Sequence, residues 1–254
     1  MDIDLNADLG EGFGPWRMGD DETLLDFLSS ANVACGFHAG DPVIMDRTVR
    51  MAKARGVDVG AHVGFPDLLG FGRRPMQVDT QELVTYVTYQ LAALAGMAQV
   101  AGHRMTHMSF HGALGNMAAA DAALAEPLVR AVADFDPKLI ISSSASRAIE
   151  GAAARCGLRV ATTFLADRAC DDDGLLVPRK LPGAVIHDRQ AVLARVRQLL
   201  EEGTVTSCTG KKIPMRVQSI LLHGDTPGAV ELARTVRGVV ESVGRIVPIS
   251  RQMA

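Results

Sequence analysis

Short apolar runs alternate with longer amphipathic stretches along this 254-residue chain. The short runs favour β-strands, and the stretches between them have the length and spacing of helices. The pattern therefore predicts βα units laid end to end. The seven predicted strands lie near residues 2–8, 32–38, 57–63, 105–111, 138–143, 159–165 and 217–223. A weaker run, Ala184-Val185-Ile186, is either an eighth strand or a loop.

Strands separated by helices pair in parallel through right-handed crossovers. Seven such units favour a closed or nearly closed barrel, and an open doubly wound sheet is the competing arrangement. No repeat, low-complexity tract or Pro/Ser-rich hinge interrupts the chain, so we predict one domain over residues 1–254. Asp41-Pro42 and Asp79 are predicted to begin helices, because a side-chain acceptor caps the free amides of a first turn.

Composition excludes several classes of function. The 26 basic and 29 acidic residues give a net charge of -3, which disfavours binding to nucleic acid. The four cysteines form no C-x-x-C pair, so they are expected to be free thiols in a reducing cytoplasm. The amino terminus lacks a secretory signal, and no run approaches the ~18 apolar residues of a membrane span. We therefore expect a cytoplasmic protein that does not bind membranes.

Nearly every predicted strand ends at a residue suited to acid, base or ligand chemistry. The carboxyl ends of parallel strands lie on one face, so such residues meet at one rim. A single histidine there is more often a core residue bonded to a carbonyl. Four at equivalent strand ends favour a shared site: His38, His62, His111 and His223. We predict that they converge with Asp8 around one solvent-open mouth.

The first strand carries three polar residues on one face, Asp4, Asn6 and Asp8, because alternate side chains of a strand point the same way. Asp4 is interpreted as a structural carboxylate. Asp8 buried among histidines would hold an imidazolium or bind a cation, and either arrangement favours proton transfer near neutral pH.

Two glycine-rich segments, residues 10–14 and 70–74, follow predicted strand ends. Neither has the spacing of a Rossmann fingerprint or a P-loop. They either make tight turns or bring the backbone close to a ligand. In the second case the guanidinium of Arg73 or Arg74 would bind a carboxylate or phosphate through two hydrogen bonds.

The strand-end motifs are long enough to be compared with a known family. They are Asp4-Leu5-Asn6-Ala7-Asp8-Leu9-Gly10-Glu11-Gly12, Ser30-Ala31-Asn32-Val33-Ala34-Cys35-Gly36-Phe37-His38-Ala39-Gly40-Asp41, Gly60-Ala61-His62, Gly70-Phe71-Gly72-Arg73, His111-Gly112-Ala113-Leu114, Ala166-Asp167-Arg168, Leu176-Val177-Pro178-Arg179 and His223-Gly224-Asp225. Together, and in this order, they resemble the LamB/YcsF family over almost the full length of the chain.

The resemblance implies an α/β fold, an irregular seven-stranded TIM-like barrel of the glycoside hydrolase/deacetylase type. It implies ATP-dependent opening of 5-oxoproline to L-glutamate, together with separate 5-oxoprolinase subunits B and C. The predicted catalytic residues are Asp8, Glu11, His38, His62, His111, Asp167 and His223. The predicted substrate-binding residues are Asn6, Asp41, Arg73, Asn116, Arg168 and Asp225.

The chain departs from the family pattern at four positions. Ser109 and Gly115 stand where the family usually has lysine and tyrosine, and Thr163 and Cys170 stand where it has glutamate and tyrosine. Loss of a cation and a carboxylate together is consistent with deletion of a buried ion pair as a unit, which leaves no orphan charge. It would also remove a phosphate or oxyanion contact.

The preferred hypothesis is therefore ATP-dependent hydrolysis of a cyclic amide, with ATP bound mainly on partner subunits because the chain has no recognised nucleotide loop. Asp8 or His38 would act as general base. His62 or His111 would stabilise the oxyanion or protonate the leaving nitrogen.

Two alternatives remain. One is a diverged metal-dependent amidohydrolase or deacetylase that works alone, with Asp8, His38 and His62 as ligands of a divalent metal. The other, motivated by the departures, is a subunit that binds a ligand without turnover. The sequence leaves open whether a metal is bound.

Overall fold

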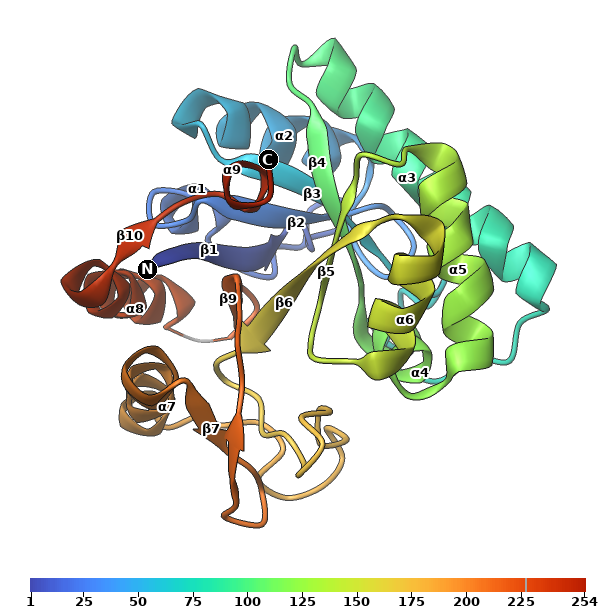
Figure 1. The fold of residues 1–254 in the computed structure, drawn as a ribbon. Helices are drawn as coiled ribbons and strands as arrows, with labels where there is room; N and C mark the ends of the chain where they lie inside the picture. Colours follow the sequence, from blue (N-terminus) through green and yellow to red (C-terminus); the bar gives the residue numbers. More distant parts are fainter. Residues whose placement is uncertain (227) are drawn as a thin grey trace.

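A computed structural model describes residues 1–226 and 228–254 (Figure 1). Its elements in chain order are β1 (Asp2–Leu9), α1 (Asp21–Leu24), β2 (Ser30–Ala34), α2 (Pro42–Arg55), β3 (Asp58–Val63), α3 (Thr80–Val100), β4 (Met105–Phe110), α4 (Gly112–Ala120), α5 (Ala122–Phe135), β5 (Ile140–Ser143), α6 (Arg147–Cys156), β6 (Arg159–Leu165), α7 (Arg189–Glu202), β7 (Thr204–Thr206), β8 (Lys212–Pro214), β9 (Ser219–His223), α8 (Ala229–Val243), β10 (Arg245–Ile246) and α9 (Ile249–Gln252).

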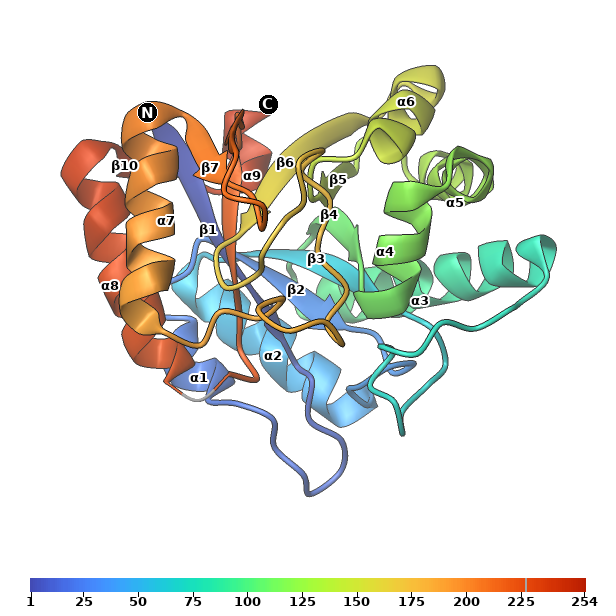
Figure 2. The ribbon, with the colours of Figure 1, turned by 90° about the horizontal axis from the view of Figure 1, so that it is seen from below.

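Seven parallel strands close into a barrel in the order β1-β2-β3-β4-β5-β6-β9, and β9 pairs with β1 to complete the ring. Helices surround the barrel, and the loops that leave β1 and β3 project from the same end of it (Figure 2). Each of the seven predicted strands overlaps one of the seven barrel strands, so the predicted barrel is confirmed. The strand predicted near residues 32–38 is β2, which ends at Ala34, so His38 lies in the loop that follows it.

The weak run at residues 184–186 is not a strand, because Val185 forms only an isolated bridge with Arg168. The sequence pattern also missed β7 and β8, which pair as an antiparallel hairpin, and β10, which pairs with the start of β1. Each of these strands has two or three residues, too few for an alternating pattern to show.

The helices begin where the capping signals place them. Asp41 caps α2, with Pro42 in its first turn, and Asp79 caps α3. By length and composition α3 could cross a membrane. Its apolar residues Leu91 and Leu94 are instead fully buried in the core that α3 forms with α5 and β3, as in a helix that covers a barrel.

Asp4 lies fully buried in the barrel wall and joins the two strands that flank β1. Its carboxylate accepts hydrogen bonds of 2.6 Å from Ser29 and Ser30, at the start of β2, and from Ser219 of β9. Burial raises its pKa to about 6, although the three hydroxyl donors act in the opposite direction. Asp4 is therefore a structural carboxylate, as predicted, with serine hydroxyls as its donors.

This pKa predicts a pH-dependent stability. Because the pKa of Asp4 in the folded chain lies above its ordinary value of 3.8, its contribution is fully present below that pH and is lost as the pH rises through about 6. The unfolding free energy of the wild type, measured by urea denaturation relative to Asp4→Asn, should fall by about 3 kcal/mol between about pH 4 and pH 8. A pH-independent difference would contradict this assignment.

Candidate active site

Four of the predicted catalytic residues meet at the carboxyl ends of the first strands: Glu11, His38, His62 and His111. We call them the rim cluster. One nitrogen or oxygen from each lies within 4.8 Å of the others. The rings of His38 and His111 stack with centroids 3.8 Å apart, and Nε2 of His62 lies 2.8 Å from Nδ1 of His111. Oε1 of Glu11 lies 3.4 Å from Nε2 of His38.

A backbone carbonyl fixes the protons on two of these rings. Nε2 of His111 donates to the carbonyl of Phe71 at 2.8 Å, because a carbonyl can only accept. Burial, followed by the nearby His38 and His62, lowers the pKa of His111 well below its ordinary value, so this ring is neutral. Its Nδ1 therefore accepts the Nε2 proton of His62, whose Nδ1 faces the hydroxyl of Ser109 at 2.7 Å.

The two carboxyl groups at the rim have opposite pKa shifts. Burial alone would raise the pKa of Asp8, but His62 at 3.4 Å, His223 and a hydrogen bond from Asn32 hold it well below its ordinary value. Burial raises the pKa of Glu11 well above its ordinary value, and the negative charge of Asp8 adds to this effect. Asp8 is therefore ionised, while Glu11 keeps its proton to a much higher pH.

His38 is the most enclosed histidine of the rim cluster. Burial, and then the charges of His62 and Arg73, lower its pKa well below the ordinary value, so the ring is neutral. Its Nδ1 is buried and has no hydrogen-bond partner among the described residues. Nε2, which faces Glu11, is the nitrogen that is available for chemistry.

Three further predicted residues lie at the ends of β6 and β9. Nδ1 of His223 contacts both carboxylate oxygens of Asp167 at 2.8 Å. Arg73, from the segment after β3, forms an ion pair of 2.8 Å with Asp225, from the segment after β9. This pair links two loops 152 positions apart in sequence.

The other predicted substrate-binding residues have structural partners or lie elsewhere. Asp41 uses its carboxylate to cap α2 and to accept the amide of Gly14. Arg168 donates to the carbonyls of Ala184 and Val177 and so holds the segment between β6 and α7. Asn6 is fully buried inside the barrel, with its side-chain amide donating to Asn32. Asn116 lies exposed on α4.

The predicted solvent-open mouth is wrong in one respect, because the clustered side chains are buried. The segment between β3 and α3, residues 64–79, lies over the rings. A Cβ on Gly72 would stand 2.7 Å from Cβ of His38 and 2.8 Å from Cδ2 of His111, so only glycine permits this approach. The packing of residues 64–79 over the histidine rings leaves no pattern in the sequence of the strand ends, so it could not be predicted from them.

Residue-level reasoning missed two contributors to the site. Arg179 is half-buried, and the charges of Arg73, Asp225, Asp167 and Asp8 all act on its pKa, which burial lowers. The motif that ends in Arg179 was the available signal. Asn32 was also missed, although its place in β2 beside Asp8 follows from the strand register.

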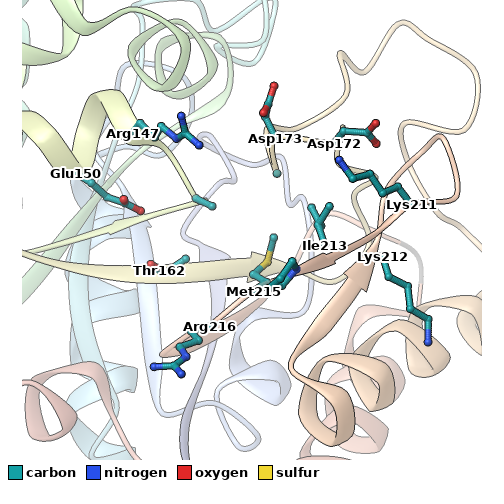
Figure 3. A pocket seen from close by; sticks show the side chains of 13 residues that line it. Arg147, Glu150, Thr162, Asp172, Asp173, Lys211, Lys212, Ile213, Met215 and Arg216 are labelled. Atoms are coloured by element: carbon teal, nitrogen blue, oxygen red, sulfur yellow. The ribbon is translucent and has the colours of Figure 1, made fainter.

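A separate cavity of about 420 Å³ lies between α6, β6 and the β7–β8 hairpin (Figure 3). Its lining includes charged side chains of both signs, among them Arg147, Asp172 and Lys211. None of the predicted catalytic or substrate-binding residues lines it. The rim cluster is therefore the better candidate for chemistry.

Comparisons with known proteins agree with the sequence resemblance. The model of the LamB/YcsF family matches residues 3–254. A 5-oxoprolinase A subunit of Ralstonia nicotianae is 68% identical over 254 residues, covering 100% of this chain and 98% of that relative. A 5-oxoprolinase A subunit of Pseudomonas syringae pv. tomato is 68% identical over 252 residues, covering 99% and 98%. Among solved structures, the lactam utilization protein from Thermus thermophilus is 40% identical, with a TM-score of 0.90 and coverage of 98% and 99%.

Gly72, which lies over the rim cluster, can be tested against Gly56, a glycine with a similar backbone conformation away from it. Gly72 has φ +61, and Gly56, at the end of α2, has φ +67 with nothing within 4 Å of an added Cβ. Alanine at either position has a backbone cost of about 1–2 kcal/mol. Only Gly72→Ala should also separate the rings of His38 and His111, which would shift their imidazole ¹⁵N resonances. Unchanged resonances in Gly72→Ala would contradict the described packing.

Proposed function

The chain belongs to the LamB/YcsF family, and from that membership we propose that it is the A subunit of a 5-oxoprolinase, which hydrolyses the cyclic amide 5-oxoproline to L-glutamate. The observation that carries this proposal is the 68% identity, across the whole chain, to relatives that bear this name. The rim cluster, together with Asp8 beside His62, supplies the acid and base groups that amide hydrolysis requires.

The reaction needs an activated carbonyl, because an unstrained amide is a poor electrophile. In the proposed sequence the lactam oxygen takes a phosphoryl group from ATP, and water adds to the activated carbon. The ring C–N bond then breaks and the nitrogen gains a proton, which leaves an acyl phosphate. A second water hydrolyses this acyl phosphate to the carboxylate and inorganic phosphate. Each of these steps calls for a proton donor, a proton acceptor or a cation at the site.

Asp8 and Glu11 suit the roles of base and acid. Asp8 is ionised and can take the proton of the attacking water, whereas Glu11 holds a proton that it can give to the leaving nitrogen. Two carboxyl groups whose surroundings push their pKa values apart are typical of such pairs. Between the two predicted bases, this favours Asp8 over the neutral and enclosed His38.

Two arginines are placed to bind the carboxylate of the substrate. Arg73 and Arg179 are both partly exposed and lie close enough for their charges to interact. A guanidinium binds a carboxylate through two parallel hydrogen bonds. We assign this role to Arg73 and Arg179 rather than to Arg168, which is buried and donates to backbone carbonyls.

The proposal includes partner subunits B and C, because the relatives are named as A subunits and such a name implies further subunits. ATP would be bound mainly by those partners, since this sequence carries neither of the recognised nucleotide loops. A cytoplasmic location agrees with its four free cysteines.

The test is 5-oxoproline-dependent ATP hydrolysis, measured with the purified chain alone and with subunits B and C. Turnover should require the partners. Asp8→Asn and His62→Ala should each lower kcat/KM by at least about 100-fold, the usual contribution of an acid–base group. His103→Ala is the control, because His103 meets the carbonyl of Val57 away from the rim. No turnover with any combination would contradict the proposal and favour a ligand-binding subunit.

The composition of the rim cluster favours a second candidate, a metal-dependent amidohydrolase. One carboxylate and three imidazoles form a donor set that suits Zn²⁺ and related ions. Nδ1 of His62 lies within hydrogen-bond distance of the Ser109 hydroxyl, and Nε2 of His111 lies within that distance of the Phe71 carbonyl. Metal-binding histidines usually make such a hydrogen bond through the ring nitrogen that does not bind the metal. A bound ion would polarise a carbonyl and lower the pKa of water. The structure groups Glu11 and His111 with the predicted ligands His38 and His62, in place of Asp8.

Metal content separates the two candidates. Under the second, protein purified without chelator should contain about one divalent ion per chain, by plasma mass spectrometry, and a chelator should abolish its activity. His38→Ala with His111→Ala should remove the ion, while Cys208→Ser, at an exposed cysteine, should retain it. A wild-type chain with less than about a tenth of an ion, or full activity in chelator, would contradict the metal-dependent candidate.

A further inference from the structure

Several large apolar side chains are exposed on the loops and helices around the rim cluster. Trp16, which is the single tryptophan of the chain, is 68% exposed, and Leu69 is 97% exposed. We define the rim patch as these two residues and the other exposed large apolar residues on the loops after β1 and β3, on helix α2 and on the first half of α3. Its members are Phe13, Trp16, Met18, Val43, Leu68, Leu69 and Tyr89. Exposed apolar groups gathered in this way mark interaction sites.

The part of the patch that carries Trp16 is held rigidly. Phe13 and Trp16 exchange two backbone hydrogen bonds of 3.0 Å, which makes a tight hairpin. The amide of Gly14 at its tip donates to Asp41, the cap of α2, at 2.8 Å. This loop projects away from the barrel (Figure 2). An aromatic side chain presented on an ordered support loses little entropy when it binds, which is typical of interface anchors.

A shallow groove of about 300 Å³ contains another part of the patch, Leu68 and Leu69. It lies between the loop after β2 and the loop after β3, and Phe37, Pro66, Leu68 and Leu69 supply its apolar lining. The ring of Tyr89 stacks on Phe37 with centroids 5.5 Å apart. The groove is large enough to receive an apolar side chain from another protein. Arg74 also lines it, and its positive charge suits the polar periphery of a protein interface.

Each loop of the rim patch and of the groove also carries part of the active site. Glu11 immediately precedes the hairpin, His38 directly follows Phe37, and Arg73 lies four positions after Leu69. The segment that bears Leu68 and Leu69 is the one that covers the rim cluster. A protein that docked on the patch would therefore lie over the site and contact the segment that closes it.

We infer that the rim patch is the docking surface for the partner subunits of the hydrolase, with Trp16 and the Leu68–Leu69 groove as its anchors. This inference rests on the proposed function, which supplies the partner. Its occupant is the assembly of subunits B and C, and it contributes an apolar side chain to the groove. Docking there limits the access of bulk water to the site and brings the partner that binds ATP to the lactam.

The experiment measures binding separately from turnover. The chain is labelled with 5-fluorotryptophan, which gives one ¹⁹F resonance from Trp16, and is titrated with unlabelled subunits B and C. The resonance should shift on binding. Trp16→Ala and Leu69→Ala should each raise the Kd, measured by calorimetry, at least about tenfold, with unchanged Tm. Val100→Ala is the matched control, because Val100 is also exposed but lies at the far end of α3.

The outcomes separate this inference from the proposed function. At saturating partner concentration Trp16→Ala should recover the wild-type kcat, because the rim cluster is intact. If both variants bind the partners like the wild type and turnover is normal, the docking surface is wrong and the proposed function stands. If the chain instead forms a dimer that Trp16→Ala dissociates, the occupant is a second copy and the inference fails. If neither binding nor turnover occurs, both proposals fail.

Discussion

The position of β1 between β2 and β9 is the constraint on which the rest of the structure depends. Its parallel register sets Asp8 beside Asn32 on one side and His223 on the other. The polar residues of β1 face the barrel interior, while Leu5 and Leu9 lie in the hydrophobic core. A slip of one residue would reverse these faces and remove Asp8 from the rim. The buried serine contacts of Asp4 join the same three strands at the opposite end.

The different surroundings of Asp8 and Glu11 give their carboxyl groups opposite pKa shifts. Asp8 lies against His62 and close to His223, so its negative charge is stabilised even though it is buried. Glu11 is buried beside that charge and near Asp225, so ionisation of a second carboxyl group is costly. A proton acceptor and a proton donor therefore lie at one rim without any unusual residue type. The described segment over the rings keeps this arrangement away from bulk water.

The sequence predicted the features that repeat and missed those that depend on a single tertiary contact. Strand periodicity and the shared carboxyl face were sufficient to bring His38, His62 and His111 together. They were not sufficient for Asp41 and Arg168, because the same side chains that bind substrates also cap helices and tether loops. The covering of the cluster arises from contacts between segments about 40 residues apart, and such contacts leave no periodic pattern.

In the proposed reaction the lactam binds at the rim cluster, beside Asp8. The most direct measurement is a crystal structure of the chain, in complex with its partners, grown with 5-oxoproline. We expect density for the lactam within hydrogen-bond distance of Asp8 and His62, with its carboxylate on Arg73. Density for the ligand in the cavity between α6 and the β7–β8 hairpin (Figure 3), and none at the rim, would contradict it.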